Sequence, residues 1–282
     1  MFRVVLLLGF LTAILLAVGF LLGGFIGMSI ALVLAVFINF FSYWYSDRIV
    51  IGIYKAKPTE NKKLNDMVEK LAREAKIPKP KVYMVPNDVP NAFATGRNPS
   101  NAVVAVTEGI LNLDDDEIEG VLSHEIAHIR NNDMLISAIA ATIGGAISFL
   151  AQIGYWSIFM GSGRRGEGNV LGLILIVIFA PLAALLVRLA ISRNEEYKAD
   201  YVGATLTKKP ESLASALKKI SEIGRENPMR GGSAATSHMW IVNPFKQDWF
   251  TGLFSTHPPV ARRIKRLEEM KHEGFVEPPE MD

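Results

Sequence analysis

Two long apolar runs at the start of the chain constrain its fold most strongly. The first covers residues 4 to about 20, and after Gly23 and Gly24 the second covers residues from about 25 to 41. Each run is close to the roughly 17–25 residues that a helix needs to cross a bilayer. Aromatic and then charged residues follow the second run at 43–48, as at a boundary between membrane and water. We therefore expect residues 1–46 to form a transmembrane hairpin rather than a cleaved signal peptide, whose apolar core is only about 7–15 residues long.

Two further apolar blocks lie at 135–160 and 170–191, separated by a polar, glycine-rich turn. They predict a second hydrophobic hairpin over residues 135–192, and hence about four transmembrane helices in all. Residues 47–134 and 193–282 would then form two halves of one catalytic part. The basic residues of these halves place that part in the cytoplasm. In the alternative with two spans, the second hairpin packs inside the protein.

Composition excludes several classes of protein. Half of the residues are apolar and the mean hydropathy is positive. Together these values are higher than is usual for a soluble domain. The net charge is only +2, and no basic stripe points to nucleic acid. The chain has no cysteine, so disulfides, thiolate metal ligands and a cysteine nucleophile are all excluded. A metal ion would have to be held by His and carboxylate side chains.

The segment between the two hairpins has the pattern of a small α/β unit. Apolar residues recur at helical spacing from Leu64 to Ala75, and Pro78 ends that run. Three β-prone segments follow at 81–85, 91–95 and 102–106. Asp114 and Glu117 have the spacing of a capping box, so a helix is expected to begin there. The sequence therefore predicts a small sheet beside that helix.

The predicted helix carries the sequence His-Glu-Ile-Ala-His at 124–128. Residues four apart lie on one face of a helix, so His124 and His128 can bind one ion at about 2.0–2.1 Å. Glu125 is turned aside from the metal and can act as general base toward a metal-activated water. This motif predicts a zinc peptidase with one Zn²⁺ per chain.

A third ligand has to come from another segment. The metzincin pattern requires Gly at the position of Asn131 and His at the position of Met134, so that class is excluded. Glu195 and Glu196 are the candidates, and Glu196 is preferred. Asp200, four residues after Glu196, is expected to fix a ligand histidine through its free ring nitrogen.

Four segments together resemble the HtpX-type membrane metallopeptidases, which are relatives of the CAAX prenyl proteases. They are residues 90–96, residues 124–128 with 132–134, residues 196–200, and Ser-Thr-His-Pro-Pro at 255–259. The resemblance implies a gluzincin catalytic domain in which His124, His128 and Glu196 bind zinc and Glu125 is the catalytic base. It also implies an endopeptidase of the prokaryotic cytoplasmic membrane that degrades misfolded membrane proteins. Where the family commonly has Arg before the ligand glutamate, this chain has Glu195.

Further residues are candidates for substrate binding. Asn91, Ala92, Phe93 and Ala94 resemble the family's substrate-facing strand, and an edge strand can hold an extended peptide through main-chain hydrogen bonds. The alternative is a core strand with Phe93 buried, and both can hold because successive residues face opposite ways. His257 is a candidate donor to the reaction's oxyanion, but it can equally fix the turn that precedes a terminal helix. His238 is a weaker candidate.

These observations predict a mainly α membrane protein with a small β-sheet and a zincin-like catalytic domain. The expected partners are the lipid bilayer and damaged membrane proteins. Three alternatives remain open: a zinc-bearing protein that binds clients without cutting them, an adaptor in which the motif at 124–128 is structural, and a CAAX-type processing protease. A protein that only binds clients has no need of a general base, so Glu125 argues against the first two.

Overall fold

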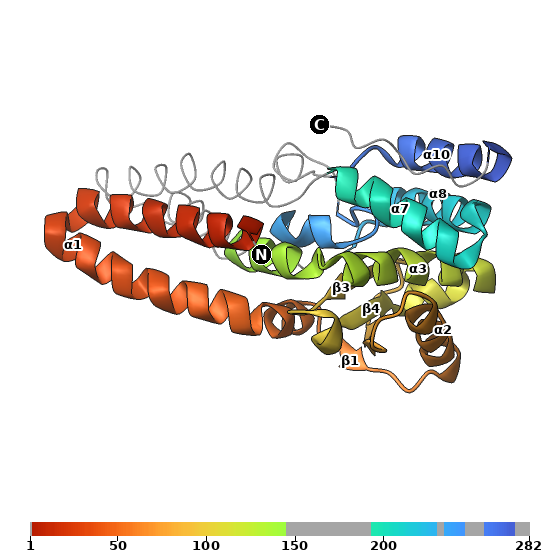
Figure 1. Cartoon of the computed structure of the whole chain (residues 1–282), viewed down its shortest axis with the longest axis horizontal. Coiled ribbons are helices and arrows are strands. Elements are labelled where there is room, and N and C mark those ends of the chain that lie inside the picture. The colour runs from red at the N-terminus through yellow and green to blue at the C-terminus, as the bar shows by residue number, and fades with distance from the viewer. Residues whose placement is uncertain (1, 145–192, 230–233, 246–256, 274–282) are drawn as a thin grey trace, which may run out of the picture.

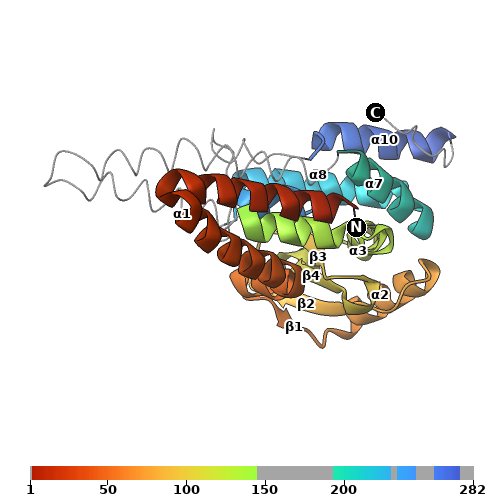
Figure 2. The same cartoon turned by 60° about the vertical axis from the view of Figure 1, so that its left-hand side comes forward.

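The computed structural model describes residues 2–144, 193–229, 234–245 and 257–273. A long helical hairpin projects from one end of a layered part made of helices and a sheet (Figure 1). In that part, α3 (Asp115–Asn131) lies between a sheet with α2 (Lys62–Glu74) on one side and three helices on the other, as both views show (Figures 1 and 2). The three helices are α7 (Arg193–Thr207), α8 (Pro210–Glu226) and α10 (Val260–Glu273).

The two predicted N-terminal apolar runs form a helical hairpin, and its position in a membrane stays a prediction. Helix α1 (Phe2–Ile53) is interrupted at Gly23 and Gly24, where Gly24 has a φ of 57° and the chain reverses direction. The two arms approach closely at Gly19 and Gly27, because a Cβ built on Gly27 would lie 2.2 Å from the Gly19 carbonyl oxygen. Small residues permit such close helix packing in membranes. The amide Nδ2 of Asn39 also donates to Thr12 Oγ1 at 2.8 Å across the arms.

The outer surface of the hairpin is apolar. Among the described residues, every large apolar side chain with high exposure lies in α1, apart from Leu111. One helix of the described chain, Gly23–Ile53 with 31 residues, is long and apolar enough to cross a membrane. It continues past the aromatic residues at 43–45, and its last turns pack against the sheet through Val50.

The beginning of the predicted third apolar block is helical over 134–144, and most of its side chains are buried. Residues 145–192, which carry the rest of the predicted second hairpin, lie outside the described residues. The number of transmembrane helices therefore stays a prediction.

The sheet contains the three predicted strands and one short addition. Strands β2 (Lys81–Val85), β3 (Ala92–Thr95) and β4 (Val103–Thr107) match the predicted segments within one residue, and β1 (Lys57–Pro58) joins them. The strand order is β1-β2-β4-β3. β2 runs parallel to β4, and β3 runs antiparallel to it. β3 is therefore an edge strand, and it lies beside α3.

Helix α3 begins with the predicted capping box, in which the Glu117 carboxylate accepts from the Asp114 N–H at 3.0 Å. It ends at Asn132, whose φ of 63° is left-handed. Two glycines let neighbouring helices approach its flanks. A Cβ on Gly203 of α7 would lie 2.9 Å from the backbone nitrogen of His124. One on Gly120 of α3 would lie 2.9 Å from the backbone nitrogen of Leu213 in α8. Three short 3₁₀ helices complete the described elements: η1 (Pro99–Asn101), η2 (Glu108–Asn112) and η4 (Ala234–Met239).

Candidate active site

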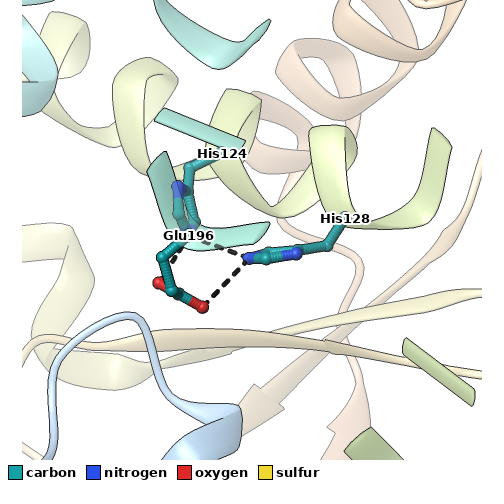
Figure 3. A group of neighbouring side chains, drawn as sticks. All are labelled: His124, His128 and Glu196. Atoms are coloured by element: carbon teal, nitrogen blue, oxygen red, sulfur yellow. Dashed lines mark hydrogen bonds and ion pairs between the residues drawn. The ribbon is translucent and has the colours of Figure 1, made fainter. Parts of the chain in front are cut away.

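Three side chains from two helices meet beside β3. His124 and His128 project from one face of α3, and Glu196 reaches them from the first turn of α7 (Figure 3). One ligand atom from each residue lies within 4.8 Å of the other two. Glu195 lines the same cavity, but Glu196 supplies the oxygen that completes this group. Among the described residues it is the one such cluster of His and carboxylate side chains.

The spacing of these atoms fits a metal ion. The two Nε2 atoms are 3.1 Å apart, His128 Nε2 is 3.5 Å from Glu196 Oε1, and His124 Nε2 is 3.8 Å from Glu196 Oε2. Ligands about 2.0–2.1 Å from a tetrahedral ion stand about 3.3–3.4 Å apart. His124 and Glu196 are buried, and His128 is largely covered. The group could therefore hold a metal ion with little further movement.

Both histidines have a carboxylate behind the ring. Asp200 lies on α7, and its Oδ1 is 2.9 Å from His124 Nδ1, as the i, i+4 spacing from Glu196 predicts. Asp133 follows α3, and its Oδ2 is 3.3 Å from His128 Nδ1. A carboxylate at Nδ1 fixes the tautomer that leaves Nε2 free to accept a metal. Each ring is therefore oriented from behind.

Arg263 of α10 contacts both Asp200 and Glu196. It is completely buried, and it donates to both Asp200 oxygens at 2.8 Å from Nε and 2.7 Å from Nη2. Its Nη1 donates to the Ile241 carbonyl at 2.7 Å and lies 3.2 Å from Glu196 Oε2. A buried charge is tolerated only when it is paired and hydrogen-bonded, and Arg263 meets both conditions.

Sequence reasoning missed Arg263, although the sequence contains a signal for it. Position 263 lies three residues after Val260 and four before Leu267, both of which pack on the core. Arg263 is therefore a charged residue on the apolar face of an amphipathic helix, which calls for a buried partner. Asp133 was noted only as part of a motif.

Glu125 lies beside the three ligand residues and is almost fully buried. Burial raises the pKa of its carboxyl to about 8, and the nearby Glu196 charge acts in the same direction. A hydrogen bond from the Ala94 N–H of β3 favours its ionised form. The general base expected from the motif is thus held between α3 and the edge strand, facing the cavity.

The other charges of the site are strongly coupled. Burial works against the charge of Glu196, but His257, His128 and Arg263 outweigh it and hold the pKa of this carboxyl well below its usual range. Burial lowers the pKa of His124 to about 4, so this imidazole is neutral at pH 7. For His128, burial is outweighed by Asp133 and Glu196, which raise its pKa. A cation placed among these atoms would displace the His128 proton.

The two other candidate histidines both lie near the metal-ligand cluster. His257 lies at the cluster, with Nδ1 3.2 Å from Glu196 Oε2. His238 lines the cavity, and its Nε2 is 3.0 Å from the Ser137 carbonyl oxygen.

Among the residues of the predicted substrate strand, Ala94 lines the cavity. Asn91, Ala92, Phe93 and Ala94 are all buried, and the Phe93 ring contacts the rings of Tyr54 and Trp240. Phe93 therefore belongs to the core, as the alternative predicted, while Ala94 lines the cavity of the candidate site.

Comparison with known proteins identifies the family of this chain. Residues 58–271 match the model of peptidase family M48. A protease HtpX homolog from Pyrococcus abyssi is 54% identical over 277 residues, covering 96% of each chain. Homologs of the same name from Pyrococcus furiosus and Persephonella marina are 53% and 52% identical, covering 96% and 95% of this chain and 96% of each of their own. The chain therefore belongs to peptidase family M48 and is a metallopeptidase of the HtpX type.

Proposed function

We propose that this chain is a zinc-dependent endopeptidase that works at a membrane and uses Glu125 as its general base. The observation that carries the proposal is the convergence of His124, His128 and Glu196 on one point, with the Glu125 carboxylate beside them. Two imidazoles and one carboxylate are one of the donor sets of catalytic zinc sites, which leave a fourth position for water or substrate.

A bound zinc ion would polarise the scissile carbonyl and increase the acidity of a water molecule in this cavity. Glu125 then accepts the proton of the attacking water and later delivers it to the leaving amine. The Ala94 N–H holds the Glu125 carboxylate in place for both transfers. His257 is close enough to the cluster to donate to the oxyanion that forms on the substrate carbonyl.

The decisive experiment compares wild type with Glu125→Gln after purification in detergent. We expect about one zinc per chain in both proteins by elemental analysis, and cleavage of an unfolded protein substrate by wild type alone. Asp115→Asn is a matched control, because it neutralises an exposed carboxylate on the same helix. Cleavage by Glu125→Gln would remove Glu125 from the mechanism, and a wild type without zinc would contradict the metal assignment. A wild type that binds unfolded protein and zinc without cleavage would support the client-binding alternative.

We further propose that the substrates are misfolded membrane proteins reached from the cytoplasm. The apolar hairpin, which includes a helix long enough to cross a bilayer, supports membrane attachment. Cleavage of one membrane protein in its unfolded but not its folded form would support a role in quality control. Selective removal of a short C-terminal segment from prenylated proteins would instead favour the CAAX-type alternative.

The orientation can be tested directly because the chain lacks cysteine. A single cysteine placed at exposed Glu108 should react with an impermeant maleimide only after cells are permeabilised. Labelling of intact cells would contradict the cytoplasmic site.

A further inference from the structure

Residues Met239 to Val242, which we call the strap, lie along the outer edge of β3. The Ile241 N–H donates to the Ala92 carbonyl at 3.0 Å. The Asn91 Nδ2 donates to the Val242 carbonyl at 2.8 Å. The strap thus pairs with the edge strand from the side opposite β4.

The pairing with β4 shows which backbone groups of β3 point away from the sheet. The Thr107 N–H donates to the Asn91 carbonyl, so Asn91 faces β4. Alternate residues of an antiparallel pair face the partner, and the backbone groups of Ala92 and Ala94 therefore point outward. These are the groups that an added peptide strand would use.

Most of these outward groups already have partners within the chain. The Ala92 N–H donates to the Asn91 side chain at 3.0 Å, and the Ala92 carbonyl accepts from Ile241. The Ala94 N–H donates to the Glu125 carboxylate. Of the four outward backbone groups of Ala92 and Ala94, the Ala94 carbonyl is the one without a partner among the described residues. The edge is therefore closed at Ala92, whereas no described residue pairs with the Ala94 carbonyl.

The strap is held on both of its faces. Trp240 is completely buried and packs edge-to-face on Phe93 and Tyr54, with ring centroids 4.8 Å apart in each case. The Ile241 carbonyl accepts from Arg263, which also binds Asp200 beside the metal ligands. Lifting the strap would expose the indole and remove a partner from a buried guanidinium. The strap is therefore a fixed wall of the site.

We propose that the strap determines how much of a substrate fits on one side of the scissile bond. Glu125 and the Ala94 N–H mark the reacting position, and Ile241 occupies the edge two residues away, at Ala92. Two strand residues cover about 6.6 Å, so about two substrate residues fit between the reacting bond and the strap. On the other side the strap does not pair with β3, so it sets no limit on a substrate that extends past Ala94. The inference rests on the proposed peptidase function and specifies its substrate register.

The test uses peptides built around one cleavage site, which is first located by mass spectrometry in an unfolded substrate of the wild-type enzyme. One series is extended residue by residue on the N-terminal side of the scissile bond, and the other on the C-terminal side. On the open side, each residue that gains a main-chain hydrogen bond should raise kcat/KM about 2- to 10-fold. On the closed side, the gain should stop after about two residues.

Two strap variants shift the limit if the proposal is correct. Ile241→Pro removes the N–H that binds Ala92, and Trp240→Ala removes the buried anchor. In either variant the ratio of kcat/KM for long and short peptides on the closed side should rise, and this ratio does not depend on total activity. Trp44→Ala is the control, because it removes a half-exposed tryptophan of α1 and should leave the ratio unchanged.

The outcomes separate this inference from the proposed function. A wild type that cleaves none of the peptides and no unfolded substrate contradicts the peptidase function itself. Cleavage with equal length dependence on both sides contradicts the strap alone. Faster hydrogen exchange at the Ile241 amide when substrate is bound would also overturn the inference, because the strap would then be a lid that substrate displaces.

Discussion

The substitution Asp200→Asn tests the buried network that supports the metal ligands. Asp200 accepts two hydrogen bonds from Arg263, at 2.7 and 2.8 Å, and lies 2.9 Å from His124 Nδ1. Removing one partner of a buried ion pair costs about 3–5 kcal/mol, because the other charge is left unpaired. Glu196 Oε2, at 3.2 Å from Arg263, offsets part of that charge. We therefore expect a loss near the lower limit, about 3 kcal/mol.

This loss is measurable as a shift in thermal unfolding. For a chain of this size, 1 kcal/mol corresponds to about 2–4 °C, so the apparent Tm should fall by about 6–12 °C in detergent. The asparagine amide can also present its NH₂ group to His124 Nδ1, which would place the ring proton on Nε2, the atom facing the metal position. Zinc affinity should therefore fall about 10- to 100-fold, as competition with a chelator would measure.

The control and the refuting result are both defined by the structure. Asp115 pairs with Lys63 at the surface, and its side chain is 69% exposed, so Asp115→Asn should barely change the Tm. If Asp200→Asn unfolds at the same temperature as Asp115→Asn and binds zinc like wild type, the buried network does not stabilise the site. If stability falls but zinc affinity is unchanged, Asp200 supports the fold and does not orient His124.

Three further predictions concern helix packing and pH. Gly203→Ala should lower the Tm and the zinc content, because the new Cβ would lie 2.9 Å from the backbone nitrogen of His124. Gly224→Ala is the control and should change neither, because a Cβ at Gly224 would have no atom within 4 Å. Gly27→Leu should loosen the hairpin and raise the protease sensitivity of α1, since a Cβ there already meets Gly19 at 2.2 Å; unchanged sensitivity would refute the close packing. Burial opposes the charge of Glu117, but hydrogen bonds from Lys219, Ser215 and Asp114 outweigh it and lower its pKa. Glu117→Gln should therefore reduce the Tm at neutral pH, and the difference from wild type should shrink as the pH falls below about 4; a difference that does not change with pH would contradict this.

Local signals in the sequence were sufficient for much of the fold. The hairpin follows from two apolar runs around Gly23 and Gly24, because only a helix satisfies its own backbone in lipid. The three main strands and the start of α3 follow from β-prone segments and a capping box, whose determinants lie within a few residues of each other. The two-residue strand β1 carries no such pattern, and its pairing with β2 depends on the chain's return from the hairpin.

Part of the candidate site was predictable for the same reason. His124, Glu125 and His128 are placed by the period of one helix, and the spacing of Glu196 and Asp200 fixes their common face on another. The sequence by itself therefore determined which side chains are available for a metal ion. Their meeting point was decided by the tertiary structure, because it depends on how closely α7 packs against α3 at Gly203.

The contacts of Arg263 and the strap were likewise decided only in three dimensions. Arg263 lies 63 residues from Asp200 and 139 from His124 along the chain, and Asn91 lies 151 from Val242. No local pattern encodes contacts at such separations, since they form only when α10 and the strap close over α7 and β3. The sequence thus determined the chemistry of this metallopeptidase, while the packing of distant segments determined the geometry of its site and the part of the strand edge that the strap covers.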